Sequence, residues 1–162
     1  MQDIRVLGLD LDGTVFDSEK RISPRTMAAM QAAIARGVVV LPATGRPVSG
    51  VPKEFLHLEG VRYALTSNGA TVTELATGRR VVELTFDADT AGQVYDIVRR
   101  FNRALSIFID GNSYTSADNM DKMVEFSPPA LRPYLRDSRI PVQDMHAFLR
   151  QHAPGIEKFS IL

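Results

Sequence analysis

A near-continuous run of apolar residues from Ile4 to Leu11 ends on two acids, and this stretch constrains the fold of the chain most. Such a run, in which apolar residues do not alternate with polar ones, is typical of a strand covered on both faces, as in a parallel sheet. Asp10 and Asp12 are two positions apart, so in an extended chain their side chains point to the same side. The sequence therefore predicts a buried parallel strand whose carboxyl end presents two carboxylates.

The rest of the first half alternates between signals for helices and signals for strands. Ser23, Pro24 and Gly37 bracket an alanine-rich helix as its cap, first residue and terminator. Residues 38–46 read as a second buried strand that runs into a turn, and residues 61–70 as a third strand. Because a short irregular helix is expected between these two, the order predicts the α/β class with a doubly wound sheet.

From about residue 70 the pattern changes to that of a small α+β unit. Two β-rich runs flank Thr77 and Gly78, which predicts a hairpin, and Asp87 is placed to cap an amphipathic helix. Asp110 ends an apolar run but lies in a stretch with the composition of a turn, which favours a hairpin over a metal ligand. We expect a core in residues 1–80 and a second, α+β domain in residues 81–162.

Composition excludes several classes of protein. Nineteen Lys and Arg balance nineteen Asp and Glu, which is unlike a nucleic-acid-binding domain, and the absence of cysteine excludes thiolate catalysis and disulfides. The three histidines, His57, His146 and His152, lack the spacing of metal ligands. We expect neither a signal peptide nor a membrane span, and therefore a cytoplasmic protein with no nucleic-acid or membrane partner.

Asp10 and Asp12 form a candidate site for phosphoryl transfer. Two neighbouring carboxylates repel each other, and Mg²⁺ would resolve this conflict because it binds carboxylate, water and phosphate oxygens. One carboxylate could then attack phosphorus. The other, whose pKa its neighbour is expected to raise, could protonate the leaving oxygen and later deprotonate a water molecule. Gly13 would allow the backbone to approach the phosphate closely.

The ends of the other two predicted strands are expected at the same edge, because ligands of open α/β sheets bind at the carboxyl ends of strands. Thr44 offers a hydroxyl there, Gly45 a turn amide and Arg46 a positive charge. Asn68 and Gly69 end the third strand. Taken alone, Thr44 and Gly45 also suit a plain turn at the end of a strand.

The segments DLDGTVFDSEKRISPRT, LPATGRP and TSNGA, in this order, closely resemble the haloacid dehalogenase superfamily. Within it they are similar to the Cof-type sugar-phosphate phosphatases, which carry an α/β cap. The resemblance implies a Rossmann-like parallel-sheet core with an inserted α+β cap, both incomplete in this chain. It also implies Mg²⁺ as cofactor and a small phosphorylated metabolite, such as a sugar phosphate, as substrate.

The resemblance also implies roles for individual residues. Asp10 matches the nucleophile that forms an aspartyl-phosphate, and Asp12 matches the general acid/base. Both match magnesium ligands, Asp10 through its side chain and Asp12 through its backbone carbonyl. The remaining matches are to phosphate-binding and substrate-binding positions: Thr44, Gly45 and Gly13 for phosphate, and Arg46, Asn68 and Gly69 for substrate.

The sequence also departs from this family. After the cap, the family supplies a lysine and a Gly-Asp-x-x-Asn-Asp type motif, neither of which follows here. None of the lysines, Lys20, Lys53, Lys122 and Lys158, matches the family lysine, and we expect surface roles for them. Losing such a charge costs roughly 10²–10³ in rate per group. We therefore expect a truncated phosphatase with weak or no activity.

Two further expectations follow from these missing parts. Exposed sheet edges invite association, so a homodimer, a swapped assembly or poor solubility is expected. A non-catalytic descendant that keeps only phosphate, metal or protein binding is the alternative function. A phospho-acceptor signalling domain is a third interpretation, but it would need an acidic acceptor after the third strand, where Ser67, Asn68 and Gly69 stand.

Overall fold

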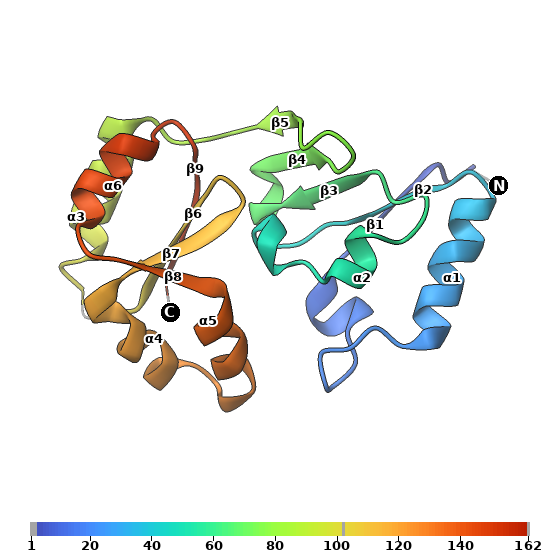
Figure 1. Cartoon of the computed structure of the whole chain (residues 1–162), viewed down its shortest axis with the longest axis horizontal. Helices are drawn as coiled ribbons and strands as arrows, with labels where there is room; N and C mark the ends of the chain where they lie inside the picture. Colours follow the sequence, from blue (N-terminus) through green and yellow to red (C-terminus); the bar gives the residue numbers. More distant parts are fainter. Residues whose placement is uncertain (1–2, 102, 162) are drawn as a thin grey trace. The chain divides into compact units, whose positions relative to one another are not determined.

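The apolar run at the start of the chain forms strand β1 (Val6–Leu9), which pairs in parallel with β2 (Val39–Pro42). The computed structural model in which this is seen describes residues 3–101 and 103–161 (Figure 1). Beyond β2, Ala43 forms a parallel bridge to Leu65 in β3 (Tyr63–Thr66). The predicted α/β class with a parallel core is therefore confirmed, and the carboxyl ends of the three strands lie at one edge.

Strand β3 also begins an antiparallel meander. It pairs with β4 (Thr71–Glu74), and β4 pairs with β5 (Arg80–Glu83). Gly78 adopts a φ of +70° in the turn between β4 and β5, which a glycine enters without a steric cost. The predicted hairpin is confirmed, and β5 completes the first of two compact units, which divide between Glu83 and Leu84.

The helices of the first unit follow the expected caps. In α1 (Pro24–Ala35) the Ser23 hydroxyl accepts the amide of Thr26, and Gly37 terminates the helix with a φ of +81°. The predicted irregular helix consists of η2 (Val48–Gly50) and α2 (Lys53–Leu56). Both regular helices contribute side chains to one apolar cluster, which also holds Leu11, Val15, Phe16, Ile22, Val40, Val51 and Val61.

The expectation that β1 is covered on both faces is wrong. Ile4 is 69% exposed and Val6 60% exposed, whereas Leu7 and Leu9 are half-buried against the cluster. Within residues 3–101 and 103–161, β2 is the one strand that pairs with β1. A parallel strand with an open edge and one covered face buries only every second side chain.

Val6→Lys is expected to reduce self-association of the chain. Among the described residues, only β2 pairs with β1, so the other edge of β1 is open to strands of other molecules, and Val6 is exposed in β1. A lysine in an edge strand opposes strand-to-strand pairing. In light scattering, the average molecular mass of the wild type should increase with protein concentration, and that of the variant should increase less. Equal masses for both would exclude this edge as the contact.

The second unit contains an antiparallel–parallel mixed sheet of four strands. Its strands are β6 (Leu105–Ile109), β7 (Asn112–Ser116), β8 (Arg139–Val142) and β9 (Ile156–Ile161), in the spatial order β8-β7-β6-β9. Asp110 and Gly111 form the tight turn between β6 and β7, with φ angles of +49° and +75°. This confirms the predicted turn at Asp110.

Helices cover both faces of this sheet. On one face, α3 (Ala88–Val98) and α6 (Met145–His152) pack with Leu105, Ile107 and Ile109 of β6; Asp87 caps α3, as predicted. Figure 1 shows α4 (Met120–Phe126) and α5 (Arg132–Ser138) away from this pair. They pack with Ala104 in a separate cluster. Two short helical turns precede them, η4 (Ala117–Asn119) and η5 (Pro129–Leu131).

The elements α4, α5 and β8 were not predicted from the sequence. None of the helices in the part of the chain that the structure describes is long and apolar enough to cross a membrane.

Candidate active site

The two acids flank a buried leucine at the end of β1. Leu11 is fully buried, whereas Asp10 and Asp12 are exposed on either side of it, so both acids point away from the apolar cluster. The turn that follows, η1 (Leu11–Val15), is closed by the amides of Val15 and Phe16, which donate to the carbonyls of Asp10 and Leu11. The Asp10 side chain makes no capping hydrogen bond with this turn.

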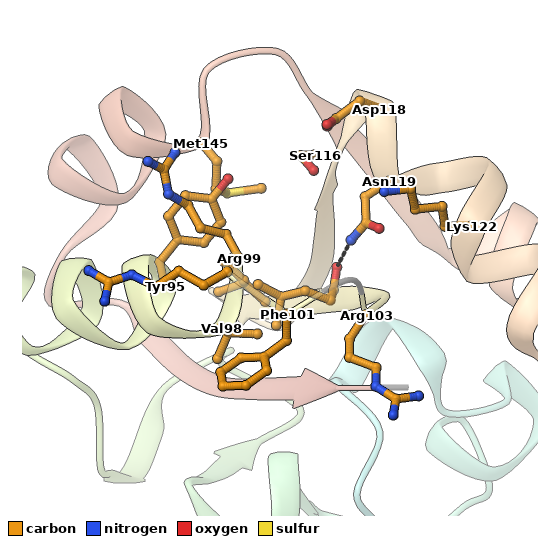
Figure 2. A pocket seen from close by; sticks show the side chains of 13 residues that line it. Tyr95, Val98, Arg99, Phe101, Arg103, Ser116, Asp118, Asn119, Lys122 and Met145 are labelled. Atoms are coloured by element: carbon orange, nitrogen blue, oxygen red, sulfur yellow. Dashed lines mark hydrogen bonds between the residues drawn. The ribbon is translucent and has the colours of Figure 1, made fainter.

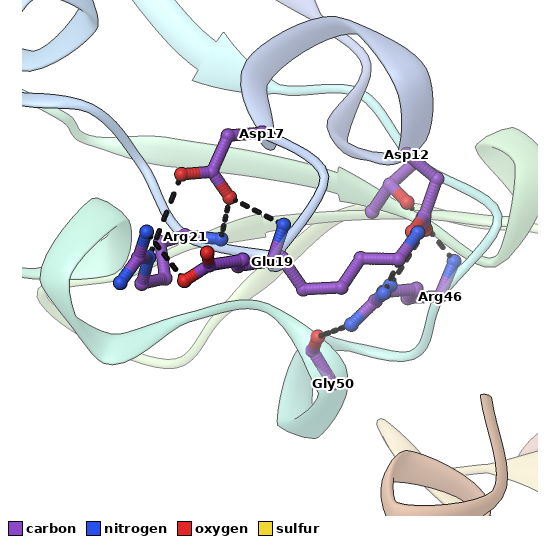
Figure 3. Close-up of polar contacts among 8 residues, drawn as sticks. Asp12, Asp17, Glu19, Arg21, Arg46 and Gly50 are labelled. Carbon is purple, nitrogen blue, oxygen red and sulfur yellow. Dashed lines mark hydrogen bonds and ion pairs between the residues drawn. The ribbon is translucent and has the colours of Figure 1, made fainter. Parts of the chain in front are cut away.

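Asp12 is held by two cations (Figure 3). The Arg46 guanidinium donates from Nε to Oδ2 and from Nη2 to Oδ1 of Asp12, both at 2.9 Å. Lys20 Nζ donates to the same Oδ1 at 2.8 Å. Arg46 itself is fixed by the carbonyl of Gly50 at 3.1 Å and lies over the ring of Phe16. This bidentate ion pair is among the stronger charge-assisted contacts that proteins make.

The expectation that the pKa of Asp12 is raised is therefore wrong. Partial burial raises this pKa, but the hydrogen bonds and charges of Arg46 and Lys20 outweigh the burial and lower it below its usual value. Lys20 is exposed, as expected, and its ammonium group also pairs with Asp12. No signal in the sequence paired Lys20 with Asp12, since the contact depends on how the loop after η1 folds back.

Thr44 connects the ends of β2 and β3. Its amide donates to the carbonyl of Leu65 at 3.0 Å, and its carbonyl accepts the amide of Asn68 at 3.2 Å. Its hydroxyl accepts the amide of Arg46 at 3.2 Å, and the residue is only 4% exposed. As an acceptor in this bond, the hydroxyl still has its own proton to donate to a bound oxyanion.

The backbone after β3 is unusual. Ser67, Asn68 and Gly69 have φ angles of +53°, +60° and +91°, and the first two are not glycine. Left-handed residues in succession cost about 1–2 kcal/mol each for side chains other than glycine, and such conformations concentrate at functional sites. The amide of Ser67 donates to the carbonyl of Arg46 at 2.9 Å, so this turn supports the Arg46 backbone. This supporting role of Ser67 was not predicted from the sequence.

Gly13→Ala is expected to destabilise the chain by about 1 kcal/mol, because alanine disfavours the φ of +83° found at this position. No atom lies within 4 Å of an added Cβ, so the backbone conformation alone would cause the loss. Gly92→Ala is the matched control: it also meets no atom, but it lies inside α3, where alanine should stabilise by about 0.5–1 kcal/mol. Urea unfolding measures the free energy of unfolding of both variants, which should fall for Gly13→Ala and rise for Gly92→Ala. Losses of equal size in the two variants would contradict the positive φ of Gly13 as the cause.

The donors at the end of β1 fit a hard cation. Among the residues that the structure describes, no three carboxylate or histidine side chains gather around one point, so a metal would need water or phosphate ligands. The carboxylate of Asp10 takes no part in capping η1. The peptide carbonyl of Asp12 is not an acceptor in either of the two backbone hydrogen bonds that close this turn. Mg²⁺ commonly binds such sets of one or two protein oxygens, with water and phosphate completing its shell.

The second unit contains a cavity of about 500 Å³ (Figure 2). The last turns of α3 and the start of α4 line it, with the side chains of Tyr95, Arg99, Asp118 and Asn119 around it. Burial and the charge of Asp118 raise the pKa of Tyr95. Asn119 donates to the carbonyl of Leu105 at 3.5 Å. The residues lining this cavity include none of the predicted site residues.

Comparison with known proteins shows the family to which the chain belongs. Residues 7–151 match the family model of the haloacid dehalogenase-like hydrolases. The protein named "Putative phosphatase YxeH" of Bacillus subtilis is 30% identical over 114 residues, which cover 68% of this chain and 42% of that protein. The HMP-PP phosphatase of Serratia proteamaculans is 27% identical over 106 residues, 65% of this chain and 38% of that protein. The chain thus spans less than half the length of these relatives.

Two solved structures show the same fold. A haloacid dehalogenase-like hydrolase from Bacteroides thetaiotaomicron superposes with a TM-score of 0.74 at 21% identity, covering 99% of this chain and 58% of that one. A sugar phosphatase of subclass IIB of the same superfamily has a TM-score of 0.71 at 18% identity, covering 97% of this chain and 58% of that one. Each covers the α/β core as well as the α+β unit that follows.

Proposed function

Because the chain belongs to the haloacid dehalogenase-like hydrolases, we propose that it carries the phosphoryl-transfer site of a Mg²⁺-dependent phosphatase for small phosphomonoesters. Sugar phosphates are the substrate class that we favour. In this proposal the first unit is the catalytic core and the second is the cap. The observation that carries the proposal is the position of Asp10, Asp12, Thr44 and Asn68 at the carboxyl ends of three adjacent strands.

Asp10 is the nucleophile in this proposal. One of its carboxylate oxygens would attack phosphorus, the bond to the leaving oxygen would break, and an aspartyl-phosphate would form on Asp10. The hydroxyl of Thr44 and the turn amides near Gly13 and Gly45 would donate to the phosphoryl oxygens. Mg²⁺, held by the Asp10 carboxylate and the Asp12 carbonyl, would neutralise phosphoryl charge when bound.

Asp12 is the general acid and base, and Arg46 controls when it can act. While Arg46 and Lys20 lower the pKa of Asp12, the carboxylate stays ionised and has no proton for the leaving oxygen. An arriving phosphoryl group offers Arg46 a second anion, so its guanidinium can exchange carboxylate oxygens for phosphoryl oxygens. Asp12 would then take up a proton from solvent, donate it to the leaving oxygen, and later take one from the water that hydrolyses the aspartyl-phosphate.

A binding role without turnover is the second candidate. The two cations on Asp12 favour it, since a permanently ion-paired carboxylate cannot serve as an acid. In that case, phosphate would bind beside Arg46, but Asp10 would not be phosphorylated.

Acyl-phosphate trapping separates the two candidates. The chain is incubated with ³²P-labelled acetyl phosphate, with Mg²⁺ or with a chelator, and quenched in acid. We expect a label that requires Mg²⁺ and that hydroxylamine removes, together with slow Mg²⁺-dependent hydrolysis of para-nitrophenyl phosphate. Absence of the label under all conditions would contradict the phosphatase proposal, and phosphate binding without the label would support the second candidate.

A further inference from the structure

One face of the sheet in the second unit carries a row of four side chains from four strands. Lys158 in β9 pairs with Phe108 in β6, Phe108 pairs with Ser113 in β7, and Ser113 pairs with Arg139 in β8. Side chains of directly paired residues project from the same face of a sheet. The row therefore begins and ends on a positive charge.

The two cations converge on the ring in the row. Lys158 Nζ lies 5.0 Å from the centroid of the Phe108 ring, and Arg139 Cζ lies 5.6 Å from it. Arg139 starts two strands away from Phe108, so its side chain must cross β7 at Ser113 to reach the ring. Its Nε also donates to the hydroxyl of Ser106 at 3.0 Å, which fixes the guanidinium over this part of the sheet.

The positive charges are close enough to oppose each other. Burial and the charge of Arg139 both lower the pKa of Lys158. The surface role that the sequence analysis expected for Lys158 is therefore wrong, because this lysine is half-buried beside a second cation.

The row also holds a hydroxyl without an acceptor. Ser113 is fully buried, and its Oγ has no hydrogen-bond partner among residues 3–101 and 103–161. Buried hydroxyls are nearly always paired, since leaving one unpaired costs about 1–3 kcal/mol. An oxyanion beside the arginine that crosses Ser113 would supply the missing acceptor.

We propose that Arg139 and Lys158, with the Ser113 hydroxyl between their strands, form a binding site for a phosphoryl group. A phosphate monoester carries a charge of about −1.5 to −2 at neutral pH, which matches the two cations. Nε and Nη1 of Arg139 already donate to the hydroxyls of Ser106 and Ser138, at 3.0 and 2.7 Å, so Nη2 is the guanidinium nitrogen that would donate to such a group. This site goes beyond the proposed function, because it lies within the second unit and does not depend on chemistry at Asp10.

The rival interpretation is that both cations only cover the ring of Phe108. Cation–aromatic contacts of this kind stabilise folds without any ligand. In that case phosphate would not approach Lys158, and the Ser113 hydroxyl would have no effect on phosphate affinity.

The lysines of the chain provide a local test on the full chain. Reductive methylation with ¹³C-formaldehyde labels Lys20, Lys53, Lys122 and Lys158 while keeping their charges, and lysine-to-arginine variants assign the four signals by NMR. Inorganic phosphate at constant ionic strength is expected to shift the Lys158 signal and to raise the pH at which Lys158 titrates. The exposed Lys53 should not respond, and Lys20 reports separately on phosphate at Asp12.

Three variants test whether the phosphate-induced shift of the Lys158 signal depends on the other residues of the row. Ser113→Ala and Arg139→Gln should each weaken phosphate binding, measured at Lys158, by about tenfold. Arg136→Gln in α5, an exposed arginine of the same unit, should leave it unchanged. Ser113→Ala removes an unpaired buried hydroxyl and is expected to fold. A Lys158 signal that ignores phosphate, follows chloride equally, or responds alike in wild type and Ser113→Ala would overturn the proposal, whatever Lys20 shows.

Discussion

Asp10→Asn is expected to remove the hydroxylamine-sensitive phosphate label and to lower the Mg²⁺-dependent turnover of para-nitrophenyl phosphate by about 10³-fold or more. An amide cannot attack phosphorus as a carboxylate does, and it also removes the anionic oxygen proposed to hold Mg²⁺. The fold should survive, because the Asp10 side chain is exposed and makes no capping contact with η1. Quantifying the acid-quenched label, with circular dichroism to verify folding, measures the effect.

The control for this variant is Asp137→Asn. Asp137 is an exposed acid in α5 of the second unit, so the substitution makes the same change of charge outside the site. Its label and turnover should equal those of the wild type. If Asp10→Asn retained a wild-type level of label, another residue would be the acceptor and the assignment of the nucleophile would have to be abandoned.

Arg46→Ala is expected to raise the pKa of Asp12 towards its usual value and to lower the free energy of unfolding at neutral pH by about 1–2 kcal/mol. The variant loses two hydrogen bonds to Asp12, one to the carbonyl of Gly50, and the contact over Phe16. Arg46 is only 13% exposed, but Asp12 is 42% exposed, so water replaces part of what the carboxylate loses. Lys20 keeps a smaller lowering effect on this pKa.

The pH dependence of this loss follows from the direction of the shift. The pKa of Asp12 is lower in the folded chain than in the unfolded chain, so the ionised carboxylate stabilises the fold above the unfolded pKa. That stabilisation disappears as the pH falls through the lowered, folded pKa. The difference between wild type and Arg46→Ala should therefore be largest at neutral pH and shrink in acid.

Carboxyl ¹³C NMR, with Asp12→Asn to assign the signal, measures this pKa, and urea unfolding at several pH values measures the stability. Arg46→Lys keeps the charge but loses the bidentate geometry, so its effect should be intermediate. Arg25→Ala removes an exposed arginine from the first turn of α1 and should change stability by less than about 0.5 kcal/mol. A stability loss for Arg46→Ala that is the same at neutral and acid pH would refute the coupling to Asp12.

Local chemistry in the sequence was sufficient to predict most of the helices and turns. Ser23 and Asp87 begin helices by accepting an amide three residues on, and such contacts lie within one turn of chain. The hairpin turns at Gly78 and Asp110 were equally predictable, because the backbone angles there suit few residues. By contrast, residues 117–142 were missed: α4 and α5 are only seven residues each, too short for a clear apolar period.

For the candidate site, the sequence by itself determined the positions of Asp10, Asp12 and Thr44, since parallel strands with short βα connections must bring their carboxyl ends to one edge. Only the tertiary structure decided the state of Asp12. Its pKa depends on Arg46, 34 positions along the chain, and on Lys20, which a loop folds back onto it. The row from Arg139 to Lys158 likewise exists only through strand register. Charge and hydrogen-bond energies depend on distances of a few ångströms between groups, and those distances arise only when the chain folds.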